Sequence, residues 1–385
     1  MKIGIFTNNY LPNPYGVSAS VESFRKEFEA LGHEVFVFAP NWKDFQDTNP
    51  NVFRYPSIDI EFKFRFPLPI PYSWEMDKIL DGLDLDIIHA QHPNLLGSAA
   101  MKWAKRKKIP LVFTWHTLYD QYTHFFPLLP KKLAVRWVIK NARKYANKAD
   151  QVIIPTQSAK KIIQEWEVKN KNIAVIPSGV EKDFENQDGG SVRKKYAISD
   201  DATVLFTNSR LTSEKNTEFL VSTVADILKQ DKRLKFMVVS DGYLMPKLQE
   251  IANQAGVSQQ VIFCGLVDKK EIGNYYAAGD IFVYASKSET QGMVIMEAMY
   301  VGLPVVAVRS TGIEDSVVDG QTGFLVPENK SYFQQAIMKL INDKNLRQQF
   351  SVAAQKIARE KYTAQVCAGK MLEVYENTIK GKIRK

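Results

Sequence analysis

A chain of 385 residues exceeds the roughly 250 to 300 residues at which a single hydrophobic core stops growing, so two domains are expected. Charged residues make up 24% of the chain and apolar residues 45%, which excludes disorder as the dominant state. The two cysteines are too few for a disulfide framework or a zinc site. This usage is typical of a reducing compartment.

The net charge of +9 is concentrated in the first half of the chain. Residues 1–180 contain 24 Lys and Arg against 17 Asp and Glu, a balance of +7, which leaves 27 against 25, or +2, for the rest. Between Lys102 and Lys148, twelve basic residues accompany one acidic residue, Asp120. Such a run is typical either of a solvated face or of a surface for an anionic partner.

The N-terminus is a short apolar run that reaches Asn8 and Asn9 too early for a signal peptide, so it predicts a first β-strand. The sequence contains no stretch of 18 apolar residues, and a transmembrane helix is not expected. We therefore expect a cytoplasmic protein whose contact with a membrane is peripheral, on the inner face of the cell membrane.

Short apolar strands alternate with helical patterns, as in parallel sheets built from βαβ units. In the first half, helices are expected at Ser18 to Leu31 and Lys131 to Lys148. The strands are expected at Lys2 to Thr7, Val35 to Ala39, Asp86 to Ala90, Leu111 to Thr114, Gln151 to Pro155 and Ile173 to Ile176.

A polar segment from Glu181 to Ser199 predicts a linker, and a second series of strands follows it. The fold class is therefore α/β, with two doubly wound, Rossmann-like domains at 1–180 and 181–362, and a last helix within 363–385 that packs back on the first. The later strands are expected at Thr203 to Thr207, Phe236 to Ser240, Val261 to Gly265, Ile281 to Ala285, Val305 to Val308 and Gly323 to Val326.

Polar residues follow two strands of the second domain, where ligands of such sheets bind. Arg210 and Lys215 follow the first of these strands and open a helix, so they predict a diphosphate site. Glu289 and Glu297 follow another strand, with Gly292 between them. Glu297 is embedded in apolar residues, a setting that is costly for a carboxylate without a partner.

The two glutamates, separated by seven residues, resemble the signature of the retaining glycosyltransferases of family 4, which adopt the GT-B fold with two domains facing across a cleft. The resemblance extends through most of the chain. The matching segments are residues 176–180, 210–215, 240–242, 265–267 and 319–324. Two positions of the second domain depart from the family pattern, and in the first domain only Gly16 matches a pair of glycines that is common before Val17. Ser209 stands where Gly is frequent, and Gln291 stands where Phe is frequent.

The resemblance implies a role for each matching residue. Arg210 and Lys215 are expected to hold the donor diphosphate, Glu289 the sugar hydroxyls and Glu297 the nucleotide ribose. The two cations would stabilise the leaving group, so neither a metal site nor a cofactor is expected. Further donor-binding residues are expected at Gly16, Asp241, Gly242, Val267, Thr290, Gln291, Met293 and Val294, and Gly292 joins them because its backbone can approach a ligand closely.

In the first domain, His116 follows a strand end, which makes it a candidate catalytic residue. The segment from Trp115 to Phe125 resembles diacylglycerol glucosyltransferases and, less closely, phosphatidylinositol mannosyltransferases, in which the matching histidine lies beside the transferred sugar. Gly16 lies in a loop before a helix, which suits a diphosphate or is simply a tight turn.

The helix at Lys131 to Lys148 has cations spaced by four residues, which form a slowly winding stripe. With Trp137 at its border, the stripe predicts docking on an anionic membrane surface, and a solvated face is the alternative. The stripe consists of Lys132, Arg136, Lys140, Lys144 and Lys148.

The expected function is transfer of a hexose, glucose from UDP-glucose, to a lipid acceptor such as diacylglycerol or a glycolipid. The partners are then a nucleotide-sugar donor, a lipid acceptor and an anionic membrane surface, and no nucleic acid is expected. Three alternatives remain open. They are a family 4 transferase for a soluble sugar or a polyprenyl-linked glycan, a GT-B epimerase, and a non-catalytic protein that binds anionic lipid or nucleic acid.

Overall fold

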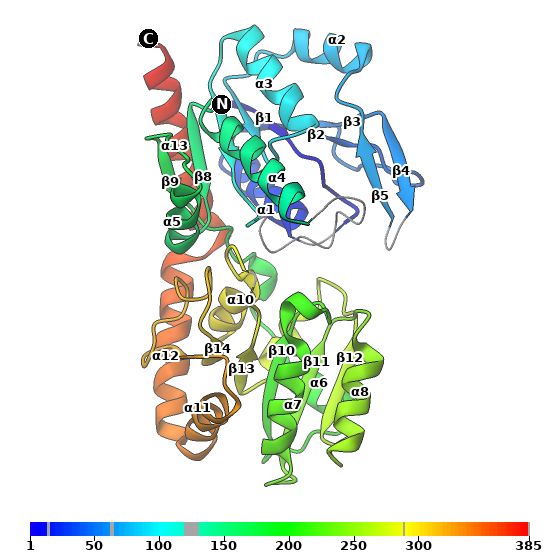
Figure 1. The fold of residues 1–385 in the computed structure, drawn as a ribbon, viewed down its shortest axis with the longest axis vertical. Helices are drawn as coiled ribbons and strands as arrows, with labels where there is room; N and C mark the ends of the chain where they lie inside the picture. Colours follow the sequence, from blue (N-terminus) through cyan, green and yellow to red (C-terminus); the bar gives the residue numbers. More distant parts are fainter. Residues whose placement is uncertain (14–15, 62–64, 119–130, 288, 384–385) are drawn as a thin grey trace. The chain divides into compact units, whose positions relative to one another are not determined.

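The computed structural model describes residues 1–13, 16–61, 65–118, 131–287 and 289–383 (Figure 1). The chain divides into two compact units. The first comprises Met1–Gly179 together with Ala364–Lys385, and the second comprises Val180–Thr363. Both units are α/β folds around a parallel sheet, which confirms the expected pair of Rossmann-like domains.

The sheet of the first unit has seven strands in the order β3-β2-β1-β6-β7-β8-β9, all paired in parallel. Most of these strands are buried, as expected of a parallel sheet covered on both faces. The strands are β1 Lys2–Phe6, β2 Glu34–Pro40, β3 Val52–Tyr55, β6 Ile87–Ala90, β7 Leu111–Thr114, β8 Gln151–Ile154 and β9 Ile173–Val175.

Helices cover the two faces of this sheet with separate apolar cores. One core contains Trp103 of α3, Ala142 of α4 and Ile163 of α5. The other contains Phe28 of α1 and Tyr375 of α13, the C-terminal helix. The helices are α1 Val17–Ala30, α2 Trp74–Gly82, α3 Leu96–Lys107, α4 Lys131–Ala146, α5 Gln157–Glu165 and α13 Ala364–Ile383.

The C-terminal helix α13 is anchored by a buried polar contact. The hydroxyl of Tyr375 lies 2.5 Å from Nδ1 of His89, and Nε2 of His89 lies 2.6 Å from the hydroxyl of Thr114. Burial lowers the pKa of His89 to about 3, so the imidazole is neutral at physiological pH. His89 therefore serves as a polar core residue between the sheet and α13.

The first unit also has elements that the sequence did not predict. They are β3 at the edge of the sheet and an antiparallel hairpin of β4, Ser57–Glu61, and β5, Arg65–Pro69. Pro67 and Pro69 read as strand breakers, but each strand of a two-stranded hairpin has an outer edge, where proline is tolerated.

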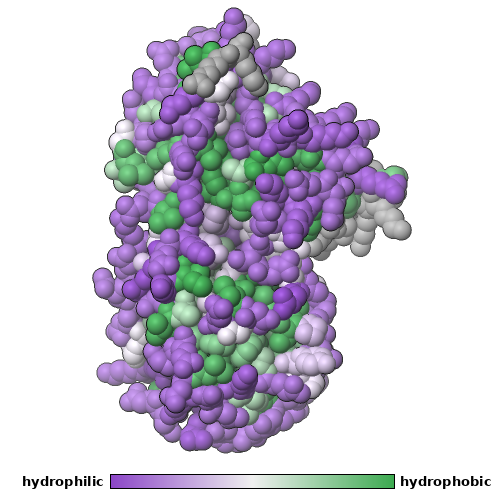
Figure 2. Space-filling model, turned by 90° about the vertical axis from the view of Figure 1, so that its left-hand side faces the viewer, coloured by the Kyte–Doolittle hydropathy of each residue, from purple (hydrophilic) through white to green (hydrophobic). Residues whose placement is uncertain are grey.

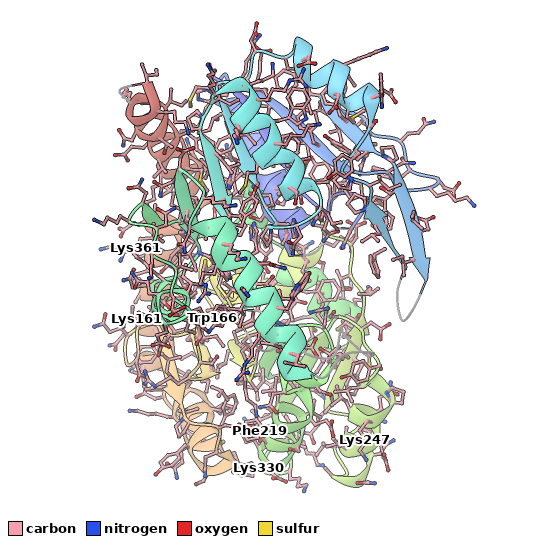
Figure 3. All side chains as sticks on the ribbon, turned by 45° about the horizontal axis from the view of Figure 1, so that its top comes forward. Lys161, Trp166, Phe219, Lys247, Lys330 and Lys361 are labelled. Carbon is pink, nitrogen blue, oxygen red and sulfur yellow. The ribbon has the colours of Figure 1, made fainter. Side chains whose placement is uncertain are left out.

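The second unit contains a six-stranded sheet in the order β12-β11-β10-β13-β14-β15, again parallel throughout. On one of its faces, α7 and α11 pack together through Phe219, labelled in Figure 3, and Phe333. Their ring centroids are 5.8 Å apart. The strands are β10 Thr203–Asn208, β11 Leu234–Val239, β12 Val261–Gly265, β13 Ile281–Tyr284, β14 Val305–Val308 and β15 Gly323–Val326.

Two short helical segments of this unit, η3 Lys182–Phe184 and α6 Gly189–Lys195, lie where a linker was expected, and another, η4 Ser213–Lys215, lies in the loop after β10. The other described helices are α7 Thr217–Leu228, α8 Met245–Gln254, α9 Ile272–Ala277, α10 Met293–Val301, α11 Lys330–Asn342 and α12 Lys344–Lys361.

The predicted linker from Glu181 to Ser199 is wrong. Its η3 and α6 bury Phe184, Val192 and Ile198 in the core of the second unit. Three widely spaced apolar residues among polar ones look like a linker in sequence, because the pattern is too sparse to show a helical period.

The described helices include none with both the length and the apolar character needed to cross a bilayer. Figure 2 shows a largely hydrophilic face on which smaller hydrophobic areas are separated by hydrophilic ones.

Candidate active site

In the second unit, the strand order reverses at β10, which has β11 on one side and β13 on the other. Ligands of doubly wound sheets bind at the carboxyl edge beside such a reversal, because successive loops diverge there. The loop after β10 carries Arg210 and Lys215, and the loop after β13 carries Glu289. The topology therefore gathers three of the predicted residues at one edge.

Lys215 and Glu289 are in direct contact. Nζ of Lys215 donates to Oε1 of Glu289, and the hydroxyl of Tyr284 donates to the same oxygen at 2.6 Å. Burial alone would raise the pKa of Glu289, but the Lys215 ammonium and the hydrogen bonds from Lys215, Tyr284 and Ser286 outweigh it, and the pKa lies below its ordinary value. Glu289 is thus an ionised acceptor beside a cation.

The second carboxylate, Glu297 on α10, is held differently. Its Oε2 accepts from the hydroxyl of Tyr276 at 2.6 Å, and that hydroxyl accepts from Nδ2 of Asn208 at 3.1 Å. Burial raises the pKa of Glu297, an effect that the Tyr276 hydrogen bond and Lys269 reduce only in part. Asn208 ends β10, so Glu297 is tied to the strand from which the Lys215 loop departs.

The backbone between the two carboxylates turns sharply into α10. Gly292 has a φ of 75° at the N-cap of the helix, a conformation that favours glycine. The first N–H groups of a helix, here those of Met293 and Val294, have no partner inside it and suit an anionic or hydroxyl ligand. The segment is supported by Gly312, where an added Cβ would lie 2.8 Å from the Glu289 carbonyl oxygen.

Thr290 and Gln291 complete this segment. Thr290 is half-buried, and Gln291 is buried with its Nε2 3.4 Å from Sδ of Met296. The Gln291 side chain is thus engaged with α10.

The remaining donor-side residues lie in the loops after β10, β11 and β12. Arg210 is 47% exposed and lies 3.5 Å from Glu214, so its guanidinium is accessible to a ligand. The carbonyl of Asp241 accepts from the Leu211 amide at 3.0 Å, and an added Cβ on Gly242 would lie 2.3 Å from the Leu211 carbonyl oxygen. The loops after β10 and β11 therefore pack backbone to backbone. Val267, in the loop after β12, is half-buried against an apolar core of the second unit.

In the first unit, His116 follows β7 and its Nε2 lies 2.6 Å from Oε1 of Gln91, which follows the neighbouring strand β6. Burial lowers the pKa of His116 well below its ordinary value, with smaller contributions from His92 and His89. The imidazole is neutral, and because the amide oxygen of Gln91 can only accept, this contact requires the tautomer with its proton on Nε2.

The segment that carries His116 is anchored by Trp115. Its ring packs 5.9 Å from the ring of Trp166, which lies at the end of α5 and is labelled in Figure 3. Its Nε1 donates to the Thr117 carbonyl at 2.8 Å. Gly16 has a φ of 57° and is the N-cap of α1, so the predicted glycine lies at a helix N-terminus of this unit.

The basic stripe on α4 faces solvent. Arg136, Lys140 and Lys144 of α4 are exposed, and Trp137 is 60% exposed. Lys148 is also exposed, but it follows the helix, which ends at Ala146 and not at Lys148 as predicted. The side chain of Lys132 lies outside those that the structure describes. The opposite face of the helix is buried through Val138, Ala142, Tyr145 and Ala146. The amphipathic pattern read from the sequence is thus present in the described part of the helix.

The structure adds four polar side chains that sequence reasoning missed. Tyr284 and Tyr276 contact the two predicted carboxylates, Asn208 contacts the hydroxyl of Tyr276, and Gln91 contacts His116. Asn208 and Gln91 lie directly at the ends of predicted strands, and this position could have identified them as candidate site residues. The tyrosines gave no such signal, because a tyrosine in an apolar strand or helix reads as a core residue.

Comparison with protein families gives two matches that together span most of the chain. Residues 14–184 match the model of Glycosyltransferase Family 4, and residues 190–357 match that of Glycosyl transferases group 1. The boundary between the matches lies near the boundary between the two structural units.

Among characterised proteins, the chain is similar to two alpha-monoglucosyldiacylglycerol synthases. The protein of Streptococcus pneumoniae is 32% identical over 337 residues, which cover 84% of this chain and 75% of the relative. The protein of Acholeplasma laidlawii is 30% identical over 357 residues, covering 88% and 87%. Among solved structures, Alr3699/HepE of Anabaena in complex with UDP and glucose matches with a TM-score of 0.77 at 19% identity, covering 98% of this chain and all of that chain.

Proposed function

Because the chain belongs to glycosyltransferase family 4, with the two Rossmann-like domains of GT-B enzymes, we propose that it transfers glucose from UDP-glucose to a lipid acceptor such as diacylglycerol or a glycolipid. That it is a glycosyltransferase follows from the family. The donor and the acceptor are the proposal, which the names of the two synthases support.

The observation that carries the proposal is the cluster at the carboxyl edge of β10 and β13. The ammonium of Lys215, whose side chain is 11% exposed, lies against the Glu289 carboxylate. The accessible guanidinium of Arg210 belongs to the same loop as Lys215. A nucleotide sugar presents a diphosphate to cations and sugar hydroxyls to carboxylates, so the cluster matches the chemistry of the donor.

The proposed reaction retains the configuration at the anomeric carbon. The bond between that carbon and the diphosphate oxygen breaks, and the acceptor hydroxyl oxygen bonds to the carbon on the same face. The hydroxyl proton passes to the departing phosphate. Arg210 and Lys215 stabilise the charge that grows on the diphosphate, and no step requires a side-chain nucleophile. His116, neutral and held by Gln91, would contact the transferred sugar.

A lipid acceptor requires access to a membrane surface. We propose that α4 docks on anionic lipid at the inner face of the cell membrane, through Lys132, Arg136, Lys140 and Lys144, flanked by the exposed Trp137. Lys148, which follows the helix, continues this basic surface. Each basic residue near an anionic surface contributes about 1 kcal/mol to binding, and tryptophan suits the interfacial region.

The test is mass spectrometry of products formed from lipid extract with a panel of nucleotide sugars. We expect a hexosyl lipid with UDP-glucose and at most a weak signal with GDP-mannose. A product formed only on a soluble sugar or a polyprenyl-linked glycan would contradict the proposed acceptor and identify another one. Conversion of the donor without an acceptor would reveal an epimerase, and the absence of any turnover with bound anionic lipid would favour a binding protein.

A further inference from the structure

The hydroxyl of Tyr276 lies between an amide and a carboxylate from different elements. It accepts from Nδ2 of Asn208 at 3.1 Å and donates to Oε2 of Glu297 at 2.6 Å. Because the Asn208 amide group can only donate through its nitrogen, the proton of the hydroxyl points toward Glu297. The two hydrogen bonds therefore donate in one order, from Asn208 of β10 to Tyr276 of α9 and from Tyr276 to Glu297 of α10.

Only one oxygen of Glu297 is used in this way. Within the described part of the chain, Oε1 accepts no hydrogen bond from the protein, although the side chain is half-buried. A carboxylate oxygen in a partly desolvated position is costly unless a partner reaches it. Oε1 is thus the atom of Glu297 that remains for a ligand.

The ring of Tyr276 has little freedom to move. It is fully buried and stacks on Phe282 with ring centroids 6.0 Å apart, and Phe282 in turn stacks on Tyr284 at 5.7 Å. Tyr284 carries the hydroxyl that holds Glu289. One stack of three aromatic rings therefore supports both carboxylates of the site, and it limits the directions in which each can turn.

We propose that Tyr276 is a positioning residue for nucleotide binding, whose hydroxyl, oriented by Asn208, turns Glu297 so that Oε1 accepts a hydrogen bond from a ribose hydroxyl of the donor. This rests on the proposed role of Glu297 toward the ribose. It adds two residues, Tyr276 and Asn208, that act through Glu297.

The arrangement also affects the pH dependence of nucleotide binding. The other charged groups near Glu297 are Lys269 and Glu181, which pair with each other at 2.6 Å. The Tyr276 hydrogen bond opposes the effect of burial on the pKa of Glu297, so its loss lets that pKa rise further. As pH falls, the variant should lose nucleotide affinity at a higher pH than the wild type.

The experiment is calorimetric titration of the full chain with UDP and with GDP, continued with whichever binds. Tyr276→Phe keeps the ring in its stack, and we expect affinity to fall roughly 10-fold, since a hydrogen bond to a charged group is lost. The matched control is Tyr275→Phe. It removes the neighbouring hydroxyl, which accepts from Lys195 at 2.8 Å, and should leave affinity unchanged. Melting temperatures establish that both variants fold.

A double-mutant cycle separates positioning from a general structural effect. In a Glu297→Gln background, Tyr276→Phe should cost less than about 3-fold, because the two residues act as one unit. Asn208→Ala provides a second variant, which leaves the Tyr276 ring and the Glu297 carboxylate intact. It should weaken nucleotide binding, and, as in Tyr276→Phe, affinity should be lost at a higher pH than in the wild type.

Unchanged nucleotide affinity in Tyr276→Phe, or an equal loss with and without Glu297, would overturn the inference and leave the proposed function standing. Failure of the wild-type chain to bind UDP or GDP would overturn both.

Discussion

Lys215 and Glu289, 74 residues apart in the sequence, form an ion pair whose side chains are only 11% and 13% exposed. The pair joins the loop after β10 to the loop after β13, the two loops that diverge at the reversal of the strand order. Each charge is the principal partner of the other in a partly desolvated position. Removal of one therefore affects both stability and function.

Lys215→Ala should destabilise the second unit by about 3 kcal/mol at pH 7, because it leaves a buried carboxylate without its cation. The folded-state pKa of Glu289 lies below its ordinary value, so this stabilisation is present above that value and is lost as pH falls through the folded pKa. The difference in unfolding free energy between wild type and variant should thus shrink below pH 5. Denaturant titrations from pH 7 to pH 4 measure it, and a constant difference would contradict the assignment.

Arg210→Ala should separate catalysis from stability. Its side chain is 47% exposed and lies 3.5 Å from Glu214, so the loss of this long ion pair should cost less than about 1 kcal/mol of stability. Turnover should nevertheless fall roughly 100-fold or more, the scale for losing a main electrostatic stabiliser of a departing charge, and Lys215→Ala should lose at least as much. Steady-state kinetics beside thermal melts give both quantities. Wild-type kinetics in Arg210→Ala would remove this residue from the diphosphate site.

The two doubly wound sheets could be predicted from the sequence because strands buried on both faces read as continuous apolar runs. The place of Lys215 and Glu289 at the carboxyl edge of the second sheet could also be predicted, since both follow such strands, but their ion pair could not. The contacts of Tyr276 and Tyr284 could not, because burial of an aromatic ring is equally consistent with an ordinary core. Their hydroxyls acquire a role only once α9 and β13 are placed beside the carboxylates.

Gly312→Ala should disturb the site from outside it. Gly312 has a φ of 78°, and an added Cβ would lie 2.8 Å from the Glu289 carbonyl oxygen. Gly320→Ala is the matched control, since its φ of 75° imposes similar strain while no atom lies within 4 Å of its added Cβ. Each should lose about 1 kcal/mol of stability from the backbone conformation, and Gly312→Ala should lose more and raise the donor KM. Equal donor KM values in the two variants would show that Gly312 does not support Glu289.

Transfer of the sugar should persist in excess EDTA. Arg210, Lys215 and a helix N-terminus supply the positive charge that the leaving diphosphate requires, so the reaction should not depend on a divalent ion. The measurement is glycolipid formation before and after chelation, with added magnesium as the control. Activity that EDTA abolishes and magnesium restores would show that the two cations are insufficient.

The last prediction concerns α4. Changing Arg136, Lys140 and Lys144 to Glu should weaken binding to anionic vesicles by several kcal/mol, from charge reversal at about 1 kcal/mol or more per site. Their exposure and the buried opposite face of the helix mean that the fold should tolerate the change. Added salt should mimic the mutations, because exposed charges are screened beyond about 8 to 10 Å.

The measurement is flotation with and without phosphatidylglycerol, read beside glycolipid synthesis on the same vesicles. A matched control reverses three exposed lysines of the second unit, Lys270, Lys344 and Lys356, which changes the net charge equally. Hydrolysis of the donor should survive in both variants, because Arg210, Lys215 and both glutamates belong to the second unit and are unchanged. If the α4 variant binds vesicles as well as the control does, and forms as much glycolipid, the stripe is a solvated helix face and a soluble acceptor is favoured.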